Sequence, residues 1–277
     1  MDAMRCPSLS RKDPSLSRKA AATQDLRGFC VLRQHYSPDQ VAQFHTGIDE
    51  LQSIPIDFEA YRSIGVASHA LAAAMEDPDH AFWKHGLNSH DVDGVALPDA
   101  QSTAIEPVRR VDMGICGTGL WDPIVTDPTL NAIHAELAGG PCNISATYFI
   151  EKQGPATGGG LHNGGFPKDK NIYYDYDHRS STFACSSTKS VVILSDMSQL
   201  AGGPFAAIPG SHKSNFRCPF DMSDATKNPM AVPVYASPGD VILFSEGITH
   251  NAYPVLDPAI LRRSIFFCYM PSISSDK

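Results

Sequence analysis

The chain has 277 residues, of which 42% are hydrophobic and 19% charged, an ordinary composition for a globular protein with a sizeable core. A net charge of −8 argues against a nucleic-acid-binding protein, because such proteins need a broad basic surface. No run of roughly 18 apolar residues occurs, so we expect neither a transmembrane helix nor a membrane partner.

The first part of the chain predicts a polar tail followed by helices. Residues 1–22 are basic and rich in Pro and Ser, and we expect a disordered tail before a single domain over residues 23–277. Residues 28–33 predict a short apolar strand. A helix then begins at Ser37-Pro38, and its buried face has apolar residues at spacings of three and four: Val41, Phe44, Ile48 and Leu51.

Residues 66–75 predict another helix, and residues 77–105 predict an irregular surface segment that could act as a lid. A further helix starts at Asp127-Pro128 and ends at Gly139-Gly140. The seven cysteines show no CxxC pairing, which favours free thiols and a cytoplasmic location over a disulfide framework.

From residue 142 onward the pattern changes to short β-rich runs separated by Gly, Pro and Asn. Helices followed by many short strands predict one mainly-β domain, an antiparallel sandwich or barrel with flanking N-terminal helices. The predicted strands cover residues 144–151, 189–194, 205–208, 232–235, 240–244 and 264–269.

A candidate metal site centres on His162, which lies in the glycine-rich stretch 158–167. Iron sites for oxygen chemistry often use two histidines and one carboxylate. Two ligands separated by one residue on a strand point to the same side, but the residue two after His162 is Gly164. His250, which follows a distant apolar strand, is the candidate second ligand.

The order and spacing of motifs around these histidines resembles the phytanoyl-CoA dioxygenase family of iron(II)/2-oxoglutarate enzymes, from about residue 25 to residue 271. The motifs are Gly28-Phe29-Cys30-Val31-Leu32, Glu151-Lys152-Gln153-Gly154, Leu161-His162-Asn163-Gly164, Gly202-Gly203-Pro204-Phe205, Ile208-Pro209-Gly210-Ser211-His212-Lys213, Pro238-Gly239-Asp240-Val241, Thr249-His250-Asn251 and Leu261-Arg262-Arg263-Ser264-Ile265.

The resemblance implies a double-stranded β-helix, the cupin-like jelly roll, that binds Fe(II), 2-oxoglutarate and O2. It implies that His162 and His250 are the metal ligands. It also implies that Arg262 grips the far carboxylate of 2-oxoglutarate, since a guanidinium pairs bidentately with a carboxylate. Arg263 is the fallback anchor, and His212 is expected to be structural.

The chain departs from the family pattern at Gly164, where Asp or Glu is usual. Three interpretations follow. A chloride ion takes the vacant position, as in the halogenases of this class, and the protein chlorinates an unactivated C–H bond. Alternatively, water fills the position and the protein is a hydroxylase, or the protein only binds a ligand. We favour the halogenase and treat Gly164 as its determining residue.

Aromatic and charged residues alternate after the candidate site and predict a wall for a small, polar substrate, with a nucleoside or a phosphorylated nucleotide of antibiotic biosynthesis as one candidate. A solvated loop is the alternative. The candidate substrate residues are Phe166, Lys168, Tyr173, Tyr174 and Arg179. Arg109-Arg110 is a further candidate anion contact, although we favour an exposed pair of arginines there. The oligomeric state is left open.

Overall fold

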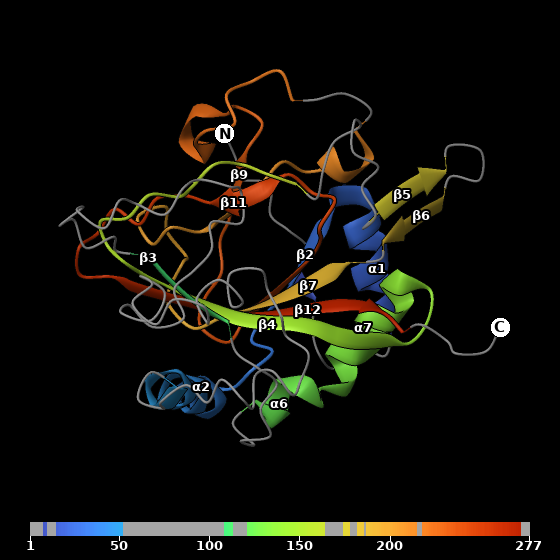
Figure 1. Ribbon diagram of the computed structural model, residues 1–277, viewed down its shortest axis with the longest axis horizontal. Helices are drawn as coiled ribbons and strands as arrows, with labels where there is room; N and C mark the ends of the chain where they lie inside the picture. The colour runs from blue at the N-terminus through green and yellow to red at the C-terminus, as the bar shows by residue number, and fades with distance from the viewer. Residues whose placement is uncertain are drawn as a thin grey trace, which may run out of the picture.

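The structure, a computed structural model, describes residues 8–9, 15–51, 108–112, 121–163, 174–177, 182–185, 187–214 and 218–272. A seven-stranded sheet has the order β1-β2-β10-β7-β12-β4-β3, and a three-stranded sheet has the order β11-β8-β9 (Figure 1). Every neighbouring pair is antiparallel except the parallel pair β1 and β2.

The strands of the large sheet are β1 (Ser8–Leu9), β2 (Phe29–Leu32), β10 (Val241–Ser245), β7 (Thr188–Ile193), β12 (Leu261–Pro271), β4 (Cys142–Gln153) and β3 (Val108–Asp112). Those of the small sheet are β11 (His250–Ala252), β8 (Phe205–Ala207) and β9 (Val232–Val234). A separate hairpin pairs β5 (Tyr174–Asp177) with β6 (Thr182–Cys185).

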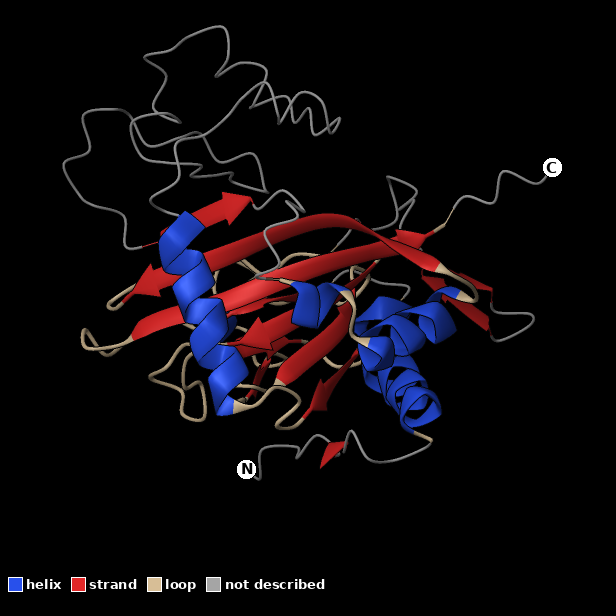
Figure 2. Cartoon of the chain, turned by 90° about the horizontal axis from the view of Figure 1, so that it is seen from below, coloured by secondary structure: helices blue, strands red, loops and turns tan. Residues whose placement is uncertain are grey.

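Helices cover one face of the large sheet, as the view from below shows (Figure 2). They are α1 (Leu16–Arg27), α2 (Pro38–Leu51), α6 (Asp122–Val125) and α7 (Pro128–Ala138). Their apolar residues pack on Val192, Leu243 and Ile265 in one core cluster. The alternate residues of the same strands form a second cluster with the small sheet, because side chains of a strand alternate between its faces: Val191, Ile193, Ile242, Phe266, Phe205 and Val234.

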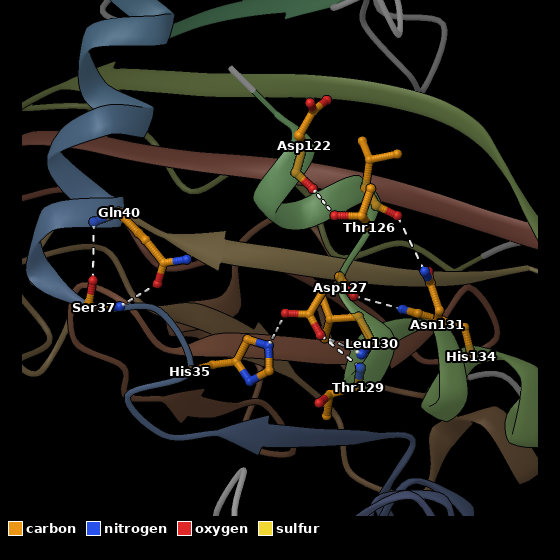
Figure 3. A network of polar contacts seen from close by, with 12 residues as sticks. His35, Ser37, Gln40, Asp122, Thr126, Asp127, Thr129, Leu130, Asn131 and His134 are labelled. Carbon is orange, nitrogen blue, oxygen red and sulfur yellow. Dashed lines mark hydrogen bonds and ion pairs between the residues drawn. The ribbon is translucent and has the colours of Figure 1, made fainter. Parts of the chain in front are cut away.

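Polar caps fix where α2 and α7 begin (Figure 3). The Asp127 Oδ1 atom accepts hydrogen bonds from the backbone N–H groups of Thr129 and Leu130, at 2.8 and 3.1 Å. Its Oδ2 atom lies 2.8 Å from Nε2 of His35, so one buried carboxylate both caps α7 and ties it to the chain after β2. At α2, the side chain of Ser37 accepts from the Gln40 N–H, and the Gln40 side chain accepts from the Ser37 N–H.

Most elements expected from the sequence are present. The helices at Pro38 and Pro128, and the six predicted strands, are confirmed within a few residues, as is the mainly-β fold class with flanking helices. Two further expectations, the helix over 66–75 and the irregular segment over 77–105, lie outside the described residues.

Helix α1 occupies part of the segment, residues 1–22, that the sequence predicts to be a disordered tail. It begins at Leu16, and Leu16 and Ala20 are buried in the core beside the helix-covered face of the sheet. Leu9 is buried as well, on a strand that pairs with β2. The helix has few apolar residues, so its periodicity is weak, and tertiary packing stabilises what the local pattern does not predict.

The described part of the chain contains no helix that is long and apolar enough to cross a membrane. Cys30, Cys142, Cys218 and Cys268 are free thiols.

A fully buried histidine on α7 joins that helix to the sheet. The His134 ring nitrogens lie 2.6 Å from the Thr188 hydroxyl and 2.7 Å from the Ser190 hydroxyl. The ring stacks on Tyr269 with centroids 3.7 Å apart. Burial lowers the pKa of His134 to about 3, so the ring stays neutral in the folded protein.

We therefore expect His134 to contribute to acid unfolding. Below the unfolded-state pKa of about 6.5, the unfolded chain binds a proton that the folded chain rejects, and stability falls from there toward pH 3. The variant His134→Gln keeps an amide for the two hydroxyls but does not titrate. Between pH 6 and 4 its unfolding free energy should fall less steeply than that of the wild type, by up to about 1.4 kcal/mol per pH unit. Parallel curves in denaturant titrations would contradict this role.

Candidate metal centre and cosubstrate site

The fold brings His162 and His250 side by side. The two residues form an isolated antiparallel bridge, in which the His162 N–H donates to the His250 carbonyl at 3.0 Å and the His250 N–H donates to the His162 carbonyl at 2.8 Å. Their ring centroids lie 4.5 Å apart. Two residues far apart in the sequence are thus fixed opposite each other by backbone hydrogen bonds.

The glycines before His162 allow this segment to lie against β11. A Cβ atom on Gly158 would stand 2.1 Å from the carbonyl oxygen of Ala252, and Gly159 has a φ of +89° beside the Asn251 side chain. The Asn251 amide also donates to the carbonyl of Gly160. Close backbone approach therefore explains this glycine-rich stretch.

Both imidazoles are oriented as metal ligands usually are. The Nδ1 atom of His250 lies 2.8 Å from the Ile248 carbonyl, and that of His162 lies 3.2 Å from the Gly160 carbonyl. Donation from Nδ1 to a carbonyl leaves the Nε2 lone pair for a metal. Burial, then the proximity of His162 and Lys189, lowers the pKa of His250 well below its usual value, and a neutral ring is the form that binds a metal.

The donor set thus fits a metal ion held by two imidazoles. Within the described ranges, no group of three or more His, Cys, Asp or Glu side chains is arranged to hold a metal. Gly164, the position of the family's carboxylate, lies outside the described residues, and by sequence it has no side chain to contribute.

Adjacent arginines on β12 point to opposite faces of the sheet. Arg262 is 3% exposed, and its Nε atom donates to the Gly203 carbonyl at 2.8 Å. Burial lowers its pKa to about 10, so it remains a cation at neutral pH. Arg263 lies on the helix-covered face, where it pairs with Glu151 at 2.7 Å and Asp49 at 2.8 Å. Only Arg262 is therefore placed to meet a ligand between the sheets.

Lys152 is a second buried cation on this face, and the sequence prediction did not assign it a role. It is the register partner of Arg262 across β4 and β12, and it is 7% exposed. Its ammonium group donates to the carbonyls of Thr157 at 3.0 Å and Gly158 at 3.4 Å. Burial, then the charge of Arg262, lowers its pKa to about 7. In the sequence, Lys152 follows Tyr148 and Ile150 at intervals of two residues, so the three side chains share one face of the strand. A lysine on an otherwise apolar strand face is the signal that could have identified it.

A third cation, Lys189, lies near His250. It forms an ion pair with Glu246, and its ammonium lies 5.9 Å from the centroid of the Phe244 ring. Phe244 in turn packs against the His250 ring with centroids 4.5 Å apart. Burial disfavours the charge, but Tyr148 and Glu246 outweigh this and raise the pKa of Lys189. The Lys189–Glu246 ion pair thus lies beside Phe244, the ring that packs against His250.

Of the predicted substrate wall, Tyr174 lies in the described part of the chain. Phe166, Lys168, Tyr173 and Arg179 lie outside the described residues, while Tyr174 begins β5 in the hairpin whose partner strand β6 lies beside α7 (Figure 1). Arg109 and Arg110 lie on β3, at the edge of the large sheet.

His212 is buried, and its Nε2 atom lies 2.9 Å from the Asp25 carbonyl oxygen. This contact suits the structural role expected for His212.

Several solved structures share this fold, and each aligns with nearly the whole chain. HygX from Streptomyces hygroscopicus with nickel and 2-oxoglutarate bound is 20% identical, with a TM-score of 0.64, and the match covers 94% of this chain and 89% of that one. AviO1 from Streptomyces viridochromogenes Tue57 is 19% identical, with a TM-score of 0.54 and coverage of 92% and 94%. SnoN, a non-heme alpha ketoglutarate dependent epimerase of nogalamycin biosynthesis, is 17% identical, with a TM-score of 0.55 and coverage of 94% and 84%. These likenesses confirm the jelly-roll fold.

No curated protein matches the sequence. The sequence profile of the family described as phytanoyl-CoA dioxygenase (PhyH), however, matches residues 25–264. That span includes both histidines, Arg262 and Lys152. The chain therefore belongs to the phytanoyl-CoA dioxygenase family and is an enzyme of the iron(II)/2-oxoglutarate-dependent oxygenase class.

Proposed function

We propose that this enzyme is an iron(II)/2-oxoglutarate-dependent halogenase, which chlorinates an unactivated C–H bond of a small, polar molecule in natural-product biosynthesis. The observation that carries the proposal is the combination of two paired histidines with Gly164. The chain keeps both imidazole ligands in ligand-like orientation, yet it has no side chain at the position where the family's carboxylate stands.

Charge supports an anion at that position. In related sites a carboxylate offsets part of the metal's positive charge, and this chain replaces it with glycine. A small anion such as chloride restores both the missing ligand and the missing negative charge, and glycine leaves it the necessary room.

Each residue has a distinct task in this proposal. His162 and His250 would hold the iron, and Arg262 would pair with the distal carboxylate of 2-oxoglutarate. Iron, 2-oxoglutarate and O2 together supply the oxidising power to remove a hydrogen atom from the substrate. Gly164 would leave room for the halide next to the metal. Oxidation by O2, with 2-oxoglutarate converted to succinate and CO2, would join the halide to the substrate carbon, and the hydrogen removed would leave in water.

The structures with a similar fold support natural-product chemistry for this enzyme. HygX has been seen with hygromycin B, and SnoN with nogalamycin RO. SnoK is a carbocyclase and SnoN an epimerase, so one fold serves several reactions, and a hydroxylase with water beside the iron is the second candidate. The substrate residues Phe166, Lys168, Tyr173, Tyr174 and Arg179 stay a prediction, as do the nucleoside and nucleotide candidates.

A chloride-dependence assay tests the proposal directly. The purified enzyme is given Fe(II), 2-oxoglutarate, O2 and a panel of nucleosides, nucleotides and aminoglycosides, with and without chloride. We expect mass spectrometry to find succinate and a chlorinated product, the latter only when chloride is present. A hydroxylated product that does not depend on chloride would favour the hydroxylase instead.

The variant Gly164→Asp should restore a carboxylate to the metal and exclude the halide. We expect at least a tenfold loss of chlorination, with hydroxylation as the product that replaces it. The isosteric variant Asn163→Asp is the matched control, because it adds the same charge one residue earlier, where the side chain lies beside Thr249. Equal chlorination by Gly164→Asp and the wild type would mean that position 164 is not at the metal.

The adjacent arginines provide a paired test of cosubstrate binding. Arg262→Met should weaken 2-oxoglutarate binding about a hundredfold, since truncating one partner of a buried charge pair costs roughly 2–5 kcal/mol. Arg263→Met should leave that affinity within about twofold and lower the unfolding free energy by about 1 kcal/mol, because it breaks ion pairs with Glu151 and Asp49. Calorimetric titration of the nickel-loaded proteins and denaturant unfolding measure the two effects. If only Arg263→Met weakened 2-oxoglutarate binding, Arg263 and not Arg262 would be the residue that binds the distal carboxylate.

A further inference from the structure

The buried pair formed by Lys152 and Arg262 has no acidic partner within the described part of the chain. The two residues are directly opposite in the β4–β12 register, so their side chains leave the sheet on the same face. They are 7% and 3% exposed, and each charge disfavours the other. The neighbouring acid Glu151 does not help, because it lies on the opposite face with Arg263. Burying two cations together is costly unless an anion joins them.

The hydrogen bonds of the two groups leave donors for such an anion. Arg262 uses Nε on the Gly203 carbonyl, and its terminal nitrogens bond to no other described residue. The Lys152 ammonium has three N–H donors, and the carbonyls of Thr157 and Gly158 accept two of them. Carbonyls satisfy hydrogen bonds but carry no net charge. One carboxylate, with two oxygens and about four acceptor positions, matches the donors that remain.

We propose that Lys152 is a second binding residue for the distal carboxylate of 2-oxoglutarate, beside Arg262. The inference rests on the part of the proposed function that places this cosubstrate against Arg262. The contacts of Lys152 also connect the cosubstrate to the metal site. Its other two N–H groups hold the backbone just before His162, so one side chain links the cosubstrate to the segment that presents a metal ligand.

A purely structural role is the competing explanation, in which Lys152 only supports the backbone at residues 157 and 158. Two ligands separate these roles. 2-Oxoglutarate and 2-oxopentanoate share the 2-oxo acid end and the chain length, but 2-oxopentanoate has a methyl group where the distal carboxylate would be. A binding role affects only the first ligand, whereas a supporting role affects both equally.

The experiment is calorimetric titration of the full-length, nickel-loaded protein with each ligand. We expect Lys152→Met to weaken 2-oxoglutarate binding about tenfold or more and 2-oxopentanoate binding less than about twofold, as for loss of a charge-assisted hydrogen bond. Lys152→Arg should recover most of the affinity. Lys213→Met is the matched control, since it removes a lysine that pairs with Asp25 elsewhere on the protein, and it should change neither ligand.

Equal weakening of both ligands by Lys152→Met, or unchanged 2-oxoglutarate binding, would overturn the inference while leaving the halogenase proposal intact. Wild-type protein that binds no 2-oxoglutarate would overturn both. Chlorination plays no part in this measurement, so loss of halogenase activity alone does not bear on it.

A second measurement needs no variant and therefore does not depend on whether Lys152→Met folds. Arg262 is the charged group that acts on Lys152 among the described residues, and a carboxylate between them favours the ammonium form. At pH 8 we expect wild-type protein to take up as much as about one proton with 2-oxoglutarate and none with 2-oxopentanoate, measured in buffers of different ionisation enthalpy. Equal proton uptake with the two ligands would contradict a contact with the distal carboxylate.

Discussion

The backbone bridge between His162 and His250 is the constraint on which the rest of the site depends. It consists of two reciprocal hydrogen bonds between segments that are distant in the sequence. The bridge forms because Gly158 and Gly159 let the chain lie directly against β11, where any larger residue would collide with its backbone or the Asn251 side chain. Each imidazole is then turned by a carbonyl two residues away. The positions of the two candidate metal ligands are thus set by main-chain contacts.

The distribution of charge around that bridge explains which ligands can bind beside it. On the outer face, Arg263 is neutralised by Glu151 and Asp49. On the inner face, Arg262 and Lys152 are buried opposite one another, and only carbonyls accept their hydrogen bonds among the described residues. Desolvated cations of this kind stabilise bound anions strongly, because little water competes for them. A dicarboxylate cosubstrate and a halide are both consistent with such an interior.

Local signals in the sequence predicted much of the fold. The starts of α7 and α2 are predictable because Asp127 and Ser37 are each an N-cap residue followed by proline. The structure adds that Ser37 and Gln40 form a capping box. Side-chain alternation along β12 is enough to place Arg262 and Arg263 on opposite faces of the sheet, as the structure does.

Other features depend on tertiary contacts that no local pattern encodes. Helix α1 is stable because Leu16 and Ala20 meet the core, although the segment looks like a polar tail. The local sequence does not single out Lys152, because its position opposite Arg262 depends on the pairing of β4 with β12. Likewise, the His35 contact that holds Asp127 in place joins segments on either side of a long intervening stretch.

The central claim is that a halide occupies the position left vacant by Gly164. The most direct test is anomalous diffraction from crystals grown with iron and 2-oxoglutarate and soaked in bromide, since bromide and iron can each be located at their own absorption edges. We predict an iron peak between the Nε2 atoms of His162 and His250, and a bromide peak in the iron's coordination sphere on the side of Gly164. Water at that position, or a carboxylate from elsewhere in the chain, would contradict the claim.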